Sequence, residues 1–181
     1  MPVELLIALF KSPAATGAVL PSSRALANAM AGAATEADII VELGAGTGSV
    51  TRALIARHPS AHLIAVEIQP RLADTLQHRY PGLDVRRAPA KQVIDQLIDT
   101  PGRIAIVSSL PFRSLPRHIA GETADSLCRF LSAAPGRKLV QFTYQPRAPF
   151  AARHGLRWER RAVVWKNTPP AGVWELQAPI V

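Results

Sequence analysis

A glycine-rich segment followed by an acidic residue carries the strongest chemical signal in this 181-residue sequence. The segment Glu42-Leu43-Gly44-Ala45-Gly46-Thr47-Gly48 lies between a short β-branched run and a stretch with helical spacing. Glycines let the backbone turn sharply and approach a ligand closely, and the following helix offers unpaired N–H groups. Glu67 ends the next apolar run, where a carboxylate can accept hydrogen bonds from both hydroxyls of a ribose. The two features together predict a site for a nucleotide-like ligand.

The residue at position 49 indicates which kind of nucleotide the turn suits. The pyrophosphate fingerprint G-x-G-x-x-G requires glycine or alanine there, and this sequence has Ser49. A dinucleotide is therefore disfavoured. A glycine turn that binds no ligand stays open as the alternative.

A second segment, Ser108-Ser109-Leu110-Pro111-Phe112, ends another apolar run and suits the chemistry of an amine. Its hydroxyls and backbone carbonyls can accept hydrogen bonds from the N–H groups of a neutral amine, which must be held in line with the carbon it attacks. Phe112 can present its π face to the positive charge that develops on nitrogen. A packed Pro-Phe turn without chemistry is the alternative.

The alternation of apolar runs with helical stretches predicts the elements that hold these segments. We expect strands at residues 38–43, 62–67, 84–86, 104–107, 138–144, 156–165 and 173–176. We expect helices at residues 49–57, 71–80, 91–98 and 117–132. The order indicates an α/β fold with a mainly parallel seven-stranded sheet and a C-terminal antiparallel hairpin, whose turn is formed by Asn167–Gly172.

Composition and charge limit the classes of partner. The net charge is +8, and residues 101–181 hold twelve basic residues against four acidic ones, whereas the first hundred residues are balanced. This asymmetry indicates an anionic partner, either nucleic acid or acidic lipid, unless the basic face serves only solubility. A single cysteine, Cys128, forms no internal disulfide, and the histidines show no metal spacing. The sequence contains no run of about 18 apolar residues, so no membrane span is predicted. A cytoplasmic location is expected.

The glycine-rich segment resembles the E-x-G-x-G-x-G cofactor loop of the class I methyltransferases that use S-adenosylmethionine. The resemblance covers roughly residues 35–145 and implies a Rossmann-like fold. It places Glu42 near the amino-acid end of the cofactor and Glu67 at the ribose, and it leaves adenine to backbone and apolar contacts near Ala88–Ala90, where the acidic residue often found in the class is absent. The cofactor residues that it implies are Glu42, Gly44, Ala45, Gly46, Gly48, Glu67, Ile68 and Ala90.

The segment at residues 108–112 is similar to the N-[LI]-P-[FY] loop of amine methyltransferases such as the rRNA adenine dimethylases, with Ser109 at the asparagine position. Further segments extend the likeness to the soluble bacterial phospholipid N-methyltransferases: residues 16–24, 110–116, 141–144 and 167–171. That family methylates phosphatidylethanolamine successively to phosphatidylcholine. The resemblance implies catalytic roles for Ser108, Ser109, Leu110 and Phe112, and lipid phosphate contacts for Arg113 and Tyr144.

The resemblance also divides the chain into two parts. Residues 1–34 are expected to form N-terminal helices, among them Val3–Lys11, that contact a membrane surface and cover the cofactor. Ser22 and Ser23 are expected to cap a helix over the carboxylate of the cofactor. Residues 35–181 form the methyltransferase domain. The implied partners are an anionic membrane surface and an amine-headgroup phospholipid at the inner face of the membrane, with no metal.

Two other functions stay open at this point. The basic C-terminal part and the segment at residues 108–112 also suit an RNA adenine N6-dimethyltransferase. Against that reading stand Ser109 in the asparagine position and the lack of an expected helical RNA-binding domain after residue 145. A non-catalytic lipid- or cofactor-binding protein with the same fold is the third possibility.

Overall fold

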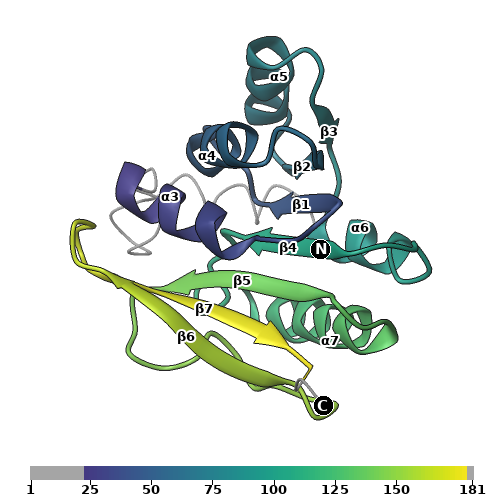
Figure 1. The fold of residues 1–181 in the computed structure, drawn as a ribbon, viewed down its shortest axis with the longest axis vertical. Helices are drawn as coiled ribbons and strands as arrows, with labels where there is room; N and C mark the ends of the chain where they lie inside the picture. Colours follow the sequence, from purple (N-terminus) through teal and green to yellow (C-terminus); the bar gives the residue numbers. More distant parts are fainter. Residues whose placement is uncertain (1–22, 179–181) are drawn as a thin grey trace.

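Seven strands form one sheet at the centre of the computed structural model, which describes residues 23–178 (Figure 1). The strand order is β3-β2-β1-β4-β5-β7-β6. The strands are β1 (Ile39–Leu43), β2 (His62–Val66), β3 (Asp84–Arg86), β4 (Ile104–Ser108), β5 (Lys138–Thr143), β6 (Arg157–Val164) and β7 (Ala171–Gln177). The first five are parallel and β7 is antiparallel to both neighbours. The expected mainly parallel sheet with an antiparallel C-terminal hairpin is confirmed.

Helices cover both faces of the sheet because the buried strands are apolar on both sides. They are α3 (Arg24–Ala33), α4 (Ser49–Arg57), α5 (Pro70–Arg79), α6 (Ala90–Gln96) and α7 (Arg117–Ala133). Successive residues of β1 show the alternation: Ile40 packs in one cluster with α3 and α4, and Val41 packs in the other with α6 and α7. Both are fully buried, and burying such a side chain contributes ~1.5–3 kcal/mol.

Parallel strands bring the loops that follow them to one edge of the sheet. We call these the carboxyl-edge loops: residues 44–48, 67–69, 87–89, 109–116, 144–148 and 165–170. The register fixes their neighbours, since Leu43 pairs with Val66 on one side and with Ser108 on the other. Both segments singled out by their chemistry, the glycine-rich turn and residues 108–112, therefore lie next to each other.

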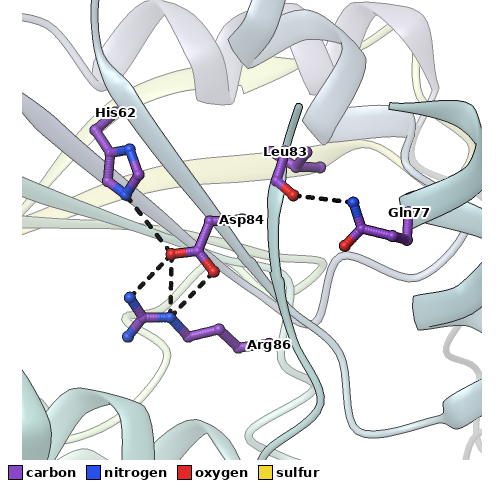
Figure 2. A network of polar contacts seen from close by, with 5 residues as sticks. All are labelled: His62, Gln77, Leu83, Asp84 and Arg86. Carbon is purple, nitrogen blue, oxygen red and sulfur yellow. Dashed lines mark hydrogen bonds and ion pairs between the residues drawn. The ribbon is translucent and has the colours of Figure 1, made fainter. Parts of the chain in front are cut away.

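The edge strand β3 is only three residues long, and polar side chains hold it (Figure 2). Nη2 of Arg86 lies 2.9 Å from Oδ2 of Asp84, and Nε2 of His62 lies 3.6 Å from the same oxygen. On the other side, the Gln77 amide donates to the carbonyl of Leu83 at 3.2 Å. These contacts tie β3 to β2 and to α5.

The N-terminal part is described only from Ser23 onward. The Ser23 hydroxyl accepts a hydrogen bond from the Leu26 N–H at 3.2 Å and caps α3, as expected for a helix start. The helix expected at Val3–Lys11 and the residue Ser22 lie outside the described residues. Among the residues that are described, no helix has the length and apolar character that spanning a bilayer would require.

Candidate active site

The glycine-rich turn connects β1 to α4 through three residues in the left-handed region. Gly44, Gly46 and Gly48 have φ values of 74°, 57° and 83°, which glycine adopts without strain. The carbonyl of Val66 accepts the N–H groups of Gly44 at 2.9 Å and of Ala45 at 3.2 Å, so the turn is fastened to the end of β2. A Cβ added at Gly46 would meet only the Gly44 oxygen, at 3.9 Å, so the backbone there faces open space.

Glu67 joins the turn to the loop after β2. Its Oε2 accepts the Gly46 N–H and its Oε1 accepts the Gln69 N–H, each at 2.8 Å. Its own N–H donates to the carbonyl of Arg86 at 3.1 Å, so the strand network described above also positions this carboxylate. Glu67 is 5% exposed, and burial raises its pKa although the backbone N–H groups oppose that shift.

Glu42 lies in β1, two residues before Gly44, and is fully buried. Its Oε2 accepts the Thr51 hydroxyl of α4 at 2.6 Å, while Oε1 is buried without a hydrogen-bond partner among the described residues. Burial raises the pKa of Glu42 to about 8. A buried carboxyl with one unpartnered oxygen suits a ligand that brings a donor or a cation. Thr51 had no predicted role, and its place near the start of the helix was the one signal for it in the sequence.

The loop after β4 lies directly against the glycine-rich turn. The Ser109 N–H donates to the carbonyl of Leu43 at 2.9 Å, and a Cβ added at Gly44 would lie 3.2 Å from Cδ2 of Leu110. The buried Ser108 hydroxyl accepts the Leu110 N–H at 3.2 Å and so shapes the loop. The Ser109 hydroxyl is half-buried and has no partner within residues 23–178. This hydroxyl is therefore available to accept a hydrogen bond from a ligand.

Gln141 supports the same loop from the neighbouring strand, a role that was not predicted from the sequence. It pairs with Ser108 in the β4–β5 register and is 1% exposed. Its Nε2 donates to the carbonyl of Leu110 at 3.1 Å and to that of Phe142 at 2.9 Å. The Leu110 carbonyl also accepts the Phe112 N–H at 3.0 Å, so two donors already occupy it. A polar amide inside the apolar run of β5 was the weak signal for Gln141 in the sequence.

Phe112 belongs to the core beneath the loop. It is 7% exposed, and its ring lies 4.7 Å from the ring of Phe150, which in turn contacts Trp158 edge-on at 5.0 Å. Such aromatic pairs add ~0.5–1.5 kcal/mol beyond their burial. In this structure the side chain anchors the loop, with little of its surface free for a substrate.

The remaining expected residues are spread along the carboxyl edge. Arg113 is exposed, and its Nη2 donates to the carbonyl of Ala148 at 3.3 Å. Tyr144 follows β5 and packs edge-on against Phe142, with the ring centroids 5.4 Å apart. Ile68 is half-buried beside Glu67, and Ala90 begins α6 and packs on the core. Ala45 is buried against the α5 side of the sheet.

These features fit the cofactor that the sequence resemblance implies. The open space at Gly46 leaves room for a ligand close to the backbone, and Glu67 stands at the end of β2 beside it. The unpartnered Oε1 of Glu42 offers an acceptor on the other side of the turn. Glu42, Gly46 and Glu67 would therefore hold S-adenosylmethionine. Among the described residues, no group of three His, Cys, Asp or Glu side chains is placed to hold a metal ion.

Two proteins are similar to this chain in sequence. One is an uncharacterised methyltransferase-like protein of Schizosaccharomyces pombe, 43% identical over 58 residues, which are 32% of this chain and 22% of that protein. The other is an ornithine lipid N-methyltransferase of Singulisphaera acidiphila, 28% identical over 147 residues, which are 76% of this chain and 74% of that protein. The chain thus spans less than a quarter of the length of the first. No family model matches it.

Solved structures resemble the chain over most of its length. A TehB-like methyltransferase from Corynebacterium glutamicum matches with a TM-score of 0.60 at 15% identity, over 98% of both chains. The 23S rRNA methyltransferase ErmE matches with a TM-score of 0.55 at 21% identity, over 84% of this chain and 67% of that one. The strand order and these likenesses agree with the expectation from the glycine-rich segment. The chain has the fold of the class I S-adenosylmethionine-dependent methyltransferases.

Proposed function

We propose that this chain is an S-adenosylmethionine-dependent N-methyltransferase that acts on the amine headgroup of a membrane lipid. Phosphatidylethanolamine and its methylated products, ending at phosphatidylcholine, are the substrates that the sequence resemblance implies. The relative named ornithine lipid N-methyltransferase supports the amine-lipid class. An ornithine lipid offers the same kind of nucleophile, and the assay below separates the two.

One observation carries the proposal: the glycine-rich turn and the loop at residues 108–112 are in contact. The Ser109 N–H binds the end of β1, and Leu110 lies against Gly44. A cofactor held over the turn and an amine held by the loop would therefore be neighbours at one edge of the sheet. This is the proximity that an in-line transfer needs, with reacting atoms roughly 3–3.5 Å apart.

Each residue of the site has a defined task in this reaction. When bound, S-adenosylmethionine supplies a methyl group on a positively charged sulfur. Glu42 would hold the amino-acid end of the cofactor and Glu67 its ribose, while the Ser109 hydroxyl would accept an N–H of the neutral amine and orient the nitrogen lone pair. Ser108 and Gln141 keep the loop in shape through the Leu110 backbone. The proton lost by the amine passes to solvent, since the loop offers hydroxyl groups but no carboxylate.

The test is methyl transfer from labelled S-adenosylmethionine by the purified full chain. Three acceptors are compared: vesicles with phosphatidylethanolamine, vesicles with an ornithine lipid, and 23S rRNA. We expect label in a lipid, and an about tenfold or larger loss in Ser109→Ala, whereas the exposed Ser60→Ala serves as the matched control. Label in RNA alone would contradict the lipid substrate. Cofactor binding measured by calorimetry without any transfer would favour the non-catalytic alternative.

A further inference from the structure

Exposed apolar side chains are concentrated at one point of the molecule. Within residues 23–178, three large hydrophobic side chains are exposed: Ile55 on α4 at 37%, Val163 at 37% and Trp165 at 77%. Val163 and Trp165 are two residues apart at the end of β6, where the chain turns into the loop at 165–170. We call residues 163–170 the hairpin tip. In Figure 1 the loop between β6 and β7 lies at the left edge, beside α3.

The hairpin tip lies at the same edge of the sheet as the candidate active site. Gly172 at the start of β7 pairs with Thr143 at the end of β5, so the tip lies next to the carboxyl end of β5. The Asn167 side chain fastens it there: Oδ1 accepts the Ser23 N–H of the α3 cap at 3.2 Å, and Nδ2 donates to the Pro169 carbonyl at 2.8 Å. Asn167 is 5% exposed, so a buried contact fixes a tip whose tryptophan points to solvent.

The exposed charges of the carboxyl-edge loops all have one sign. In the carboxyl-edge loops the acidic residue is Glu67, which is buried, and the basic residues are Arg87, Arg113, Arg147 and Lys166. Arg87 is paired with a carboxylate of α5 at 2.8 Å. The other three are exposed and have no carboxylate partner in the described part of the chain. This edge therefore presents uncompensated positive charge beside an exposed indole.

We propose that the hairpin tip docks on an anionic bilayer, with Trp165 at headgroup depth and Lys166 against lipid phosphates. Tryptophan is enriched at membrane interfaces because one part of its ring is apolar and its N–H is polar. Basic residues near an anionic leaflet are attracted to its lipid phosphates. This inference rests on the proposed lipid substrate and deepens it, because docking at this edge turns the loop at residues 108–112 toward the headgroups.

The experiment measures binding of the full chain to sedimenting vesicles of phosphatidylethanolamine and phosphatidylglycerol. We expect Trp165→Ala to weaken binding about tenfold and Lys166→Ala about threefold to fivefold. Ile55→Ala removes an exposed hydrophobic side chain on α4 and is the matched control, expected to stay within about twofold of wild type. Because Trp165 is exposed, Trp165→Ala should fold like wild type. Its melting temperature checks this.

A second measurement locates the indole itself. Lipids brominated near the headgroup should quench fluorescence of the wild type, and Trp165→Phe should lose most of that quenching while Trp158 and Trp174 remain. Equal vesicle binding by Trp165→Ala and wild type, or unchanged quenching in Trp165→Phe, would overturn the proposal. So would binding that depends on Trp165 but needs RNA or another protein instead of vesicles.

The two proposals fail in distinguishable ways. If the hairpin tip docks as proposed, Trp165→Ala should keep methyl transfer to a dispersed short-chain amine lipid within about twofold, because the loss concerns the bilayer and not the site. Docking that depends on Trp165 without methylation of any lipid would refute the proposed function and leave the docking surface standing. Methylation of vesicle lipids that is unaffected by Trp165→Ala would refute the docking surface and leave the proposed function standing.

Discussion

Glu42 shows how burial decides the state of a single carboxyl group. Its side chain is fully enclosed, Thr51 donates to one oxygen, and no cation lies beside it to favour the charged form. The pKa of about 8 means that the group is mostly protonated at neutral pH in the protein without ligand. A cationic group of a bound ligand would lower that pKa.

Replacing Glu42 by glutamine should separate these two effects. Between its ordinary pKa of 4.5 and about 8, the unfolded chain has lost the proton and the folded chain keeps it, so the free energy of unfolding falls as pH rises. We expect a loss of roughly 3 kcal/mol between pH 5 and pH 8 in wild type and much less in Glu42→Gln. Chemical denaturation at both pH values measures it. Equal losses of unfolding free energy in the two proteins would contradict the buried, protonated state of Glu42. In a separate calorimetric measurement, we expect Glu42→Gln to bind S-adenosylmethionine more weakly than wild type.

Gln141 supports the loop at residues 108–112 by a single side-chain hydrogen bond to the Leu110 carbonyl. In Gln141→Leu the Leu110 carbonyl keeps its Phe112 donor but loses Nε2, so the loop is less firmly oriented. One hydrogen bond of ~1 kcal/mol corresponds to a roughly fivefold lower kcat, with KM for S-adenosylmethionine unchanged. Steady-state kinetics measures both values. Gln145→Leu, at an exposed position of the same residue type, is the control, and a KM effect without a kcat effect would refute the positioning role.

At the scale of elements, the glycine-rich turn combines two different requirements. Gly48 is tightly packed, because an added Cβ would lie 2.8 Å from Cδ2 of Leu76, and its φ is 83°. Gly46 also has a positive φ but faces open space. Gly48 is needed for the close approach of the start of α4 to Leu76 of α5, whereas Gly46 leaves the backbone accessible.

Alanine substitutions should therefore give opposite phenotypes in the turn. Gly48→Ala should lower the melting temperature strongly, since it adds strain and a clash of ~1–3 kcal/mol. Gly46→Ala should cost only about 1 kcal/mol of stability but weaken S-adenosylmethionine binding by tenfold or more. Thermal melts and calorimetry measure the two. Gly82→Ala, at a position with nothing within 4 Å of the added Cβ, is the control. Normal cofactor binding by Gly46→Ala would show that the ligand lies elsewhere.

At the scale of the whole molecule, the charge distribution governs association with anionic surfaces. The excess of basic residues after position 100 belongs in part to β6 and its neighbouring loops, where Arg157, Arg160 and Lys166 are exposed. Some of the other charges are neutralised locally, as in the ion pair between Arg153 and Asp125. The remaining field is long-ranged at low salt and screened beyond about 8 Å at 0.15 M salt.

Binding of the full chain to vesicles with phosphatidylglycerol should therefore weaken steeply with salt. We expect an about tenfold or larger loss between 50 mM and 300 mM sodium chloride, and little binding to vesicles of uncharged lipid. Sedimentation over a salt series measures it. Vesicles of phosphatidylcholine alone are the control for apolar contact. Binding that does not change with salt would contradict an electrostatic contribution from the basic face.

The sequence by itself determined the elements and the position of the site along them. Short β-branched runs such as 39–43 and 104–108 are apolar on both faces, which are both buried when helices cover the two sides of a parallel sheet. The segment Gly44–Gly48 marks the turn between strand and helix. Local pattern therefore predicted the order of strands and helices, with boundaries within a residue or two for most, and the likeness to known loops predicted the fold class.

Only the tertiary structure decided which side chains meet. Thr51 touches Glu42 across the turn between β1 and α4. Gln141 touches Leu110 and Asn167 binds the cap of α3, and these two contacts depend on sheet register or on packing between segments far apart in sequence. The same packing turned Phe112 into the core and left Trp165 in solvent. Residue type cannot settle such outcomes, because burial depends on what the rest of the chain places on top of a side chain.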